Sequence, residues 1–156
     1  MKVIFLDIDG VLNRRACKLA HALRIHQQAD PVCVKHLNNL IARTGAKLVI
    51  SSCWRIGRTV EELQQLMKSW QVEGEVIDKT PHDWDAERGE EIACWLGDHP
   101  VESFVIIDDD KDMRKMMPFL VKTKFEFGLT AGDAARAARL FKDTKTQSMK
   151  TWVPCR

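Results

Sequence analysis

The chain has 156 residues, of which 45% are hydrophobic and 29% charged, and a formal net charge of +2. This length fits one domain with a real core, and no apolar run approaches the roughly 20 residues of a membrane span. The five scattered cysteines form no C-x-x-C pair, which argues against a structural zinc site or a disulfide framework and favours the cytoplasm. The first strand-like run reaches an aspartate at position 7, so a signal peptide is not expected.

Short apolar runs alternate with helical patterns along the chain. Strands are expected at 2–6, 46–50, 75–78, 103–107 and 119–123. Helices are expected at 14–27, 31–43, 60–70, 87–96 and 131–141. This alternation predicts a parallel sheet covered by helices on both faces, in which ligands bind at the carboxyl ends of the strands. Residues 1–143 would form the domain, and 144–156, with weak periodicity, a partly disordered tail.

Charge is distributed unevenly along the chain. Basic residues gather in 11–40 and 121–156, whereas 71–112 is strongly acidic. This asymmetry is compatible with a polyanionic partner, although solvated charged faces produce the same pattern more often.

Polar side chains follow the three clearest strands, at the point where each strand ends. Asp7 and Asp9 follow the first strand, Ser51 and Ser52 the second, and Asp108 and Asp109 the third. Because the carboxyl ends of parallel strands meet at one edge of the sheet, three separate elements converge on one site.

In an extended strand, Asp7 and Asp9 would face the same way, because side chains alternate with a period of two. Their repulsion calls for a divalent cation with oxygen ligands, above all Mg²⁺. Such a cation lets one aspartate attack phosphorus and form an aspartyl-phosphate, while the second moves protons. Ser51 would donate to a phosphoryl oxygen, and Arg88, at a helix start, would neutralise developing charge.

These segments resemble the haloacid dehalogenase (HAD) superfamily of aspartate-nucleophile phosphatases. D-I-D-G-V at residues 7–11 is similar to its first motif, and L-V-I-S, ending at Ser51, to its second. Its third motif is a lone cation, best placed at Arg88, and V-I-I-D-D, ending at Asp109, is similar to its acidic fourth motif. The resemblance covers roughly residues 1–112 and implies a HAD-type, Rossmann-like α/β fold with metal-dependent phosphoryl transfer.

Longer segments look like a narrower branch, the small HAD domain found in, or related to, RNA-repair proteins. They are I-S-S-C-W-R, R-G-E-E-I-A-C-W-L, V-I-I-D-D-D-K-D-M and G-L-T. The analogous phosphatase domain of polynucleotide kinase-phosphatases removes terminal phosphates from nucleic acid. The gaps between the motifs leave room for a minimal flap but not for a cap domain, which suits a bulky substrate such as an RNA or DNA end.

The resemblance implies a role for each matched residue. Asp7 would be the nucleophile and Asp9 the acid/base, which also offers its backbone carbonyl to Mg²⁺. The expected metal ligands are Asp7, Asp9, Asp108 and Asp109, and whether Asp108 or Asp109 binds directly stays open. Lys79 competes with Arg88 for the third motif, and Ser52 is the alternative to Ser51. The expected substrate-binding residues are Ser52, Arg14 and Arg55, the last with a purely solvated arginine as the equal alternative.

Two other functions remain open at this point. One is a HAD phosphatase for a small metabolite such as a nucleotide. The other is a non-catalytic HAD-like binding module, which is disfavoured because the acids of the first and fourth motifs are all present. The end preference, the choice between RNA and DNA and the oligomeric state do not follow from the sequence.

Overall fold

The computed structural model describes residues 1–15 and 29–143. The expected C-terminal tail at 144–156, and all but the first two residues of the expected helix at 14–27, lie outside the described residues. The strands are β1 (Lys2–Leu6), β2 (Lys47–Ile50), β3 (Val76–Lys79), β4 (Ser103–Asp108) and β5 (Leu120–Lys122). The helices are α2 (Pro31–Thr44), α3 (Val60–Ser69), α4 (Arg88–Asp98) and α5 (Ala131–Asp143), with short 3₁₀ helices η1 (Cys53–Arg55) and η2 (Arg114–Phe119).

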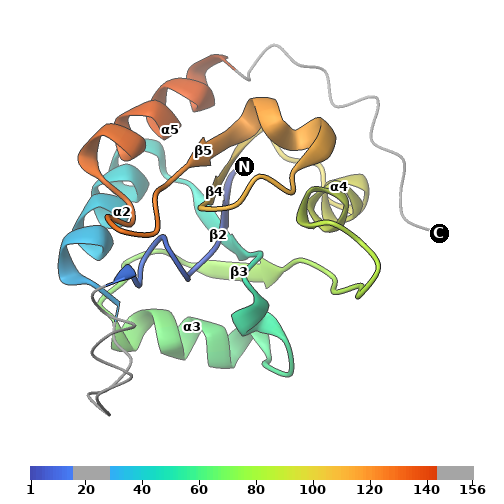
Figure 1. The fold of residues 1–156 in the computed structure, drawn as a ribbon, viewed down its shortest axis with the longest axis horizontal. Coiled ribbons are helices and arrows are strands. Elements are labelled where there is room, and N and C mark those ends of the chain that lie inside the picture. The colour runs from blue at the N-terminus through green and yellow to red at the C-terminus, as the bar shows by residue number, and fades with distance from the viewer. Residues whose placement is uncertain (16–28, 144–156) are drawn as a thin grey trace.

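The five strands form one sheet in the order β3-β2-β1-β4-β5, and every neighbouring pair is parallel. The β1 strand lies in the middle, with Leu6 opposite Ile50 of β2 and Ile107 of β4. Helices cover both faces of this sheet (Figure 1). The predicted α/β fold with a parallel sheet is therefore confirmed.

The central strands are buried on both faces, as their continuous apolar runs predict. Ile4 and Leu6 of β1 pack in a core beneath α2, α3 and α5. Val3 and Phe5 alternate with them and pack in a second core beneath α4 and η2. In this second core the Phe5 ring meets Trp95 edge-on, with ring centroids 5.4 Å apart. The strand ends are thereby fixed by well-packed side chains from both sides.

Local signals set most helix boundaries where they were expected. The Asp30 side chain accepts from the Val32 amide at the start of α2, with Pro31 at the first helical position. Thr59 and Glu62 form the predicted capping box of α3. The predicted stop of α4 at Gly97 is wrong, because the helix continues to Asp98 and ends before Pro100, whose ring disfavours helical backbone in the preceding residue. No helix in the described part of the chain is long and apolar enough to cross a membrane.

Candidate active site

The carboxyl ends of β1, β2 and β4 meet as the sequence predicts. The Asp7 amide donates to the Ile107 carbonyl at 3.0 Å, and the Ser51 amide donates to the Leu6 carbonyl at 3.1 Å. These bonds continue the strand pairing by one residue past β1 and β2 and so set Asp7 between Ser51 and Asp108.

Three carboxylates form a cluster at this edge of the sheet. One oxygen each of Asp7, Asp108 and Asp109 lie within 4.8 Å of one another. Asp7 and Asp108 are buried, with 5% and 1% of their surface exposed. Gly10, with a φ of +75°, turns the chain directly against Asp109, because a Cβ there would lie 2.2 Å from Asp109 Oδ2. Any larger residue at position 10 would therefore displace one carboxylate of the cluster.

Arg88, the first residue of α4, contacts this cluster through one nitrogen. Its Nη1 donates to Asp7 Oδ1 at 3.0 Å and to the Ser51 carbonyl at 2.6 Å, and it lies 3.5 Å from Asp108 Oδ2. Burial alone would lower the pKa of Arg88, but the charges of Asp108 and Asp7 outweigh it and raise the pKa. The Nζ of Lys79, the alternative for this role, donates instead to the backbone carbonyls of Arg58 and Arg55.

The carboxyl groups of the cluster are held in an environment that disfavours their charge. Burial raises the pKa of Asp7, although Arg88 and a hydrogen bond from Ser52 oppose the effect. Burial, followed by the negative charge of Asp7, raises the pKa of Asp108 to about 7. Closely spaced carboxyl groups whose pKa values are raised by burial and by one another form a set of oxygen ligands that suits a hard divalent cation. Asp7, Asp108 and Asp109 therefore fit Mg²⁺.

The carboxylate of Asp9 does not belong to this cluster of described residues. The β1 strand ends at Leu6, so Asp7 and Asp9 follow the strand rather than lie in it, and the amides of residues 11–13 all donate to the Ile8 carbonyl. Asp9 Oδ2 instead accepts a hydrogen bond from Trp54 Nε1 at 3.2 Å. The backbone carbonyl of Asp9 as a metal ligand stays a prediction.

Trp54 contacts Asp9 through its indole N–H, and the sequence did not predict this contact. Its ring meets Trp70 edge-on at 5.5 Å, and the Arg58 guanidinium lies 5.5 Å from the ring centroid while Nη1 of Arg58 donates to the Trp54 carbonyl. The indole is thus fixed on two sides with its N–H directed at Asp9. A signal was present, because a half-buried tryptophan near a strand end needs an acceptor for its N–H.

The two serines at the end of β2 differ in what they contact. The Ser52 hydroxyl hydrogen-bonds Asp7 and lies 3.5 Å from the Trp54 amide. The Ser51 Oγ is buried and has no hydrogen-bond partner among residues 1–15 and 29–143. A buried hydroxyl left unpaired by the protein is uncommon and often marks the place of a ligand.

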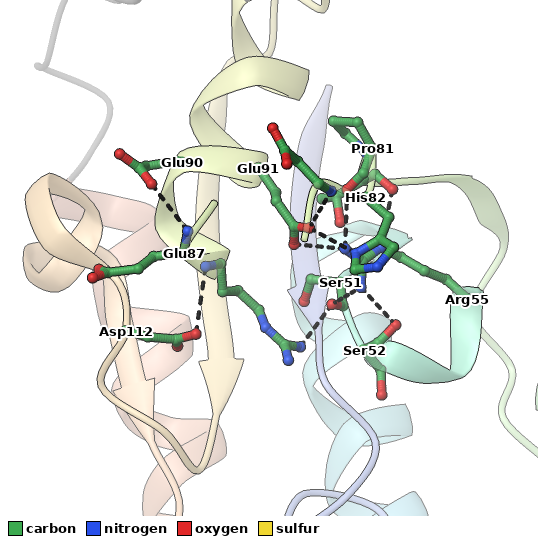
Figure 2. A network of polar contacts seen from close by, with 12 residues as sticks. Ser51, Ser52, Arg55, Pro81, His82, Glu87, Glu90, Glu91 and Asp112 are labelled. Carbon is green, nitrogen blue, oxygen red and sulfur yellow. Dashed lines mark hydrogen bonds and ion pairs between the residues drawn. The ribbon is translucent and has the colours of Figure 1, made fainter. Parts of the chain in front are cut away.

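Arg55 lies beneath the site rather than in it. Its guanidinium has five N–H groups, and only 3% of the residue is exposed. These five N–H groups donate to the carbonyls of Ser51, Ser52, Thr80 and Pro81 and to Glu91 Oε2, at 2.5–3.0 Å (Figure 2). With every donor used, this geometry leaves Arg55 nothing with which to bind substrate. Its observed contacts join the ends of β2 and β3 to α4.

Glu91 and Asp112 anchor the first turn of α4, and with it Arg88. Glu91 Oε2 accepts from Arg55, and Oε1 lies 3.1 Å from the Asp83 amide and 3.2 Å from His82 Nδ1 (Figure 2). On the other side, the Gly89 amide donates to the Asp112 carbonyl at 3.0 Å. A Cβ on Gly89 would lie 2.2 Å from the Met113 carbonyl oxygen, which explains a glycine in the first turn of a helix.

Arg14, expected to bind substrate, forms an ion pair at the start of α2. Its Nε donates to Asp30 Oδ2 at 2.5 Å, and its side chain is 37% exposed. Burial would raise the pKa of Asp30, but the hydrogen bonds from Arg14 and the Val32 amide outweigh it and lower the pKa. Contact between Arg14 and substrate remains a prediction, and the basic residues Lys18 and Arg24 lie outside the described residues.

Comparison with known proteins identifies the family of the chain. No curated protein and no solved structure matches it. The family model described as the HAD domain in Swiss Army Knife RNA repair proteins matches residues 3–134. That span contains four strands in full, all but the first residue of β1, and the Asp7, Arg88 and Asp108 contacts described above. The chain therefore belongs to this family of HAD domains.

Proposed function

We propose that the protein is a Mg²⁺-dependent phosphomonoesterase that forms an aspartyl-phosphate on Asp7. The observation that supports this most is the convergence of three carboxylates, one guanidinium and one unpaired buried hydroxyl at the strand ends. Mg²⁺, held by Asp7, Asp108 and Asp109, would screen the phosphate from these carboxylates and polarise it. The family assignment supports the same reaction class.

The residues of the chain divide the reaction between them. A carboxylate oxygen of Asp7 attacks phosphorus, the bond to the leaving oxygen breaks, and Asp9 gives that oxygen a proton. Asp9 then takes a proton from water, which attacks phosphorus and releases inorganic phosphate and free Asp7. Ser51 donates to a phosphoryl oxygen, and Arg88 steadies the growing negative charge.

We further propose that the phosphate belongs to the end of an RNA or DNA strand. The description of the family names RNA repair. The chain between β2 and β3 consists mainly of η1 and α3, and the described chain between β1 and β2 mainly of α2, so the described parts of these connections hold no cap domain. A site without a cap would be open enough to admit a polymer end.

The test compares wild type with Asp7→Asn on an aryl phosphate in Mg²⁺ and in EDTA. We expect hydrolysis only by wild type with Mg²⁺, and circular dichroism should show both proteins folded. Asp85→Asn, an exposed carboxylate on the loop before α4, controls for the change of charge. Full activity of Asp7→Asn, or none in wild type, would refute the mechanism. RNA and DNA bearing 5′- or 3′-phosphates, compared with mononucleotides, then test the substrate.

A further inference from the structure

A groove of about 270 Å³ lies between the chain that follows β5 and the start of α5. Its lining includes Lys122, Lys124, Phe127, Thr130, Asp133 and Arg136. Figure 1 shows this part of the chain in orange, between β5 and α5. Neither the proposed reaction nor any catalytic residue uses the groove.

The groove carries an excess of positive charge. Lys122 and Lys124 are exposed, and neither forms an ion pair with any residue that the structure describes. Arg136 donates to Asp133 Oδ1 at 2.8 Å, so the charges of these two residues cancel. Two uncompensated ammonium groups therefore remain on the wall of one small groove.

Phe127 presents an aromatic ring at the same place, with 59% of the residue exposed. The backbone holds it there: its amide donates to the Lys124 carbonyl at 2.9 Å, and its own carbonyl lies 3.6 Å from Cys33 Sγ. Gly128, with a φ of +65°, packs so closely that a Cβ would lie 2.7 Å from that sulfur. A fixed loop thus keeps a large apolar side chain in solvent beside Lys124.

The groove adjoins the carboxylate cluster through the end of β5. Thr123 donates its hydroxyl to the Gly10 carbonyl at 2.8 Å and its amide to the Asp108 carbonyl at 2.9 Å. Lys122 and Lys124 flank this threonine directly in the sequence. A strand whose terminal phosphate lies at Asp7 would reach the groove with its next nucleotides.

The opposite side of the cluster would repel the same strand. Residues 82–98, which lead into and form α4, contain six acidic residues and one basic residue, Arg88. Residues 120–142, from β5 through most of α5, contain five Lys or Arg and two acidic residues. Of these two sides, charge therefore favours the side of β5 and α5 for a polyanion.

We infer that this groove binds the nucleotides next to the phosphorylated end of a single-stranded nucleic acid. Lys122 and Lys124 contact backbone phosphates, and Phe127 stacks on a base. A basic groove with an aromatic platform is how proteins bind single strands without reading their sequence. The inference rests on the proposed function for the direction of the strand, whereas binding to the groove is measured separately.

The experiment uses two groove variants, Lys122→Ala/Lys124→Ala and Phe127→Ala. Lys68→Ala/Lys142→Ala is the matched control, because it removes two exposed lysines of α3 and α5 that do not line the groove. For a single-stranded oligonucleotide with a terminal phosphate, we expect KM to rise about tenfold in each groove variant, with kcat and aryl phosphate hydrolysis unchanged. The double lysine variant should also lower the slope of log affinity against log salt by about 2.

Fluorescence anisotropy with the labelled oligonucleotide, on variants that also carry Asp7→Asn, measures binding without turnover. If wild type fails to hydrolyse any phosphate, the proposed function falls, and the groove is still judged by this measurement. Affinities equal to those of the control variant would overturn the inference. Equal competition by an acidic peptide of the same charge would overturn it as well, because such a peptide has no bases to stack on Phe127.

Discussion

The charge buried at the strand ends leads to a quantitative prediction about stability without metal. Asp108 is 1% exposed, and burial followed by the charge of Asp7 raises its pKa to about 7. A carboxyl whose pKa is higher in the folded than in the unfolded chain destabilises the fold once it ionises. Asp108→Asn removes this charge, and an amide oxygen in place of Oδ1 still accepts from the Asp110 amide. We therefore expect this variant to be more stable than wild type in EDTA.

The size of the effect follows from the shift in pKa. From 3.8 to about 7 is about three units, each worth about 1.4 kcal/mol, so the ionised carboxylate destabilises the fold by up to about 4 kcal/mol above pH 7. At pH 5 the unfolded chain is already ionised and the folded Asp108 is largely protonated, which leaves a difference of only about 1.5 kcal/mol. The stability of wild type without metal should fall as the pH rises from about 4 to 7, and that of the variant should fall less.

Urea unfolding at pH 5 and pH 8, in EDTA and in Mg²⁺, measures both predictions. Wild type should gain stability from Mg²⁺ at pH 8, whereas Asp108→Asn should gain little, because binding to the folded state alone stabilises it. Asp85→Asn removes an exposed charge and should behave as wild type. Two results would refute the reasoning. One is that Asp108→Asn is no more stable than Asp85→Asn in EDTA at pH 8, and the other is that Asp108→Asn gains as much stability from Mg²⁺ as wild type does.

Three further predictions follow from other contacts. Trp54→Phe removes the N–H that holds Asp9, so hydrolysis of alkyl phosphates should fall about tenfold or more, whereas the initial burst of phenol released from an activated aryl phosphate, a step that needs no acid, should change little; equal loss in both measurements would contradict the assignment. Glu91→Gln leaves Arg55 buried with a neutral partner and should cost about 3 kcal/mol in urea unfolding, against no measurable change for exposed Glu73→Gln. Asp30→Asn keeps the cap of α2 but loses the ion pair with Arg14. Because the pKa of Asp30 is lowered in the fold, the resulting loss of up to about 1 kcal/mol should be present at pH 7 and vanish as the pH falls through this lowered pKa; a loss independent of pH would point to the cap instead.

The convergence of the site could be predicted because it depends on strands alone. The apolar run at 3–6 is buried on both faces, and the strand that contains it, β1, pairs in register with β2 and β4. Once the order of strands and helices implies a parallel sheet, the residues after each strand must share an edge. Arg88 was also predictable, because the first residue of a helix that follows a strand lies near that edge.

The contacts of Arg55 and Asp9 could not be predicted, because they depend on the paths of loops. Four backbone carbonyls and Glu91 converge on Arg55 from three separate segments, and nothing in the local pattern shows where those carbonyls point. Asp9 lies three residues after the end of β1, where three amides close a turn on the Ile8 carbonyl. The alternation rule applies within a strand, and the contacts of a residue three positions after its end depend on the turn that follows.

The contacts of Arg55 and Arg88 show why a metal would be needed for the proposed reaction. Arg55 is nearly inaccessible and satisfied by four carbonyls and Glu91, so its charge serves to hold β2, β3 and α4 together. Arg88 shares one Nη1 among Asp7, Asp108 and the Ser51 carbonyl, and despite it the pKa values of both carboxyl groups remain raised. A phosphate dianion entering this space would add negative charge where one guanidinium already fails to balance two carboxylates. Protonating Asp7 would relieve the repulsion but would also remove the nucleophile, whereas a divalent cation relieves it and leaves Asp7 ionised.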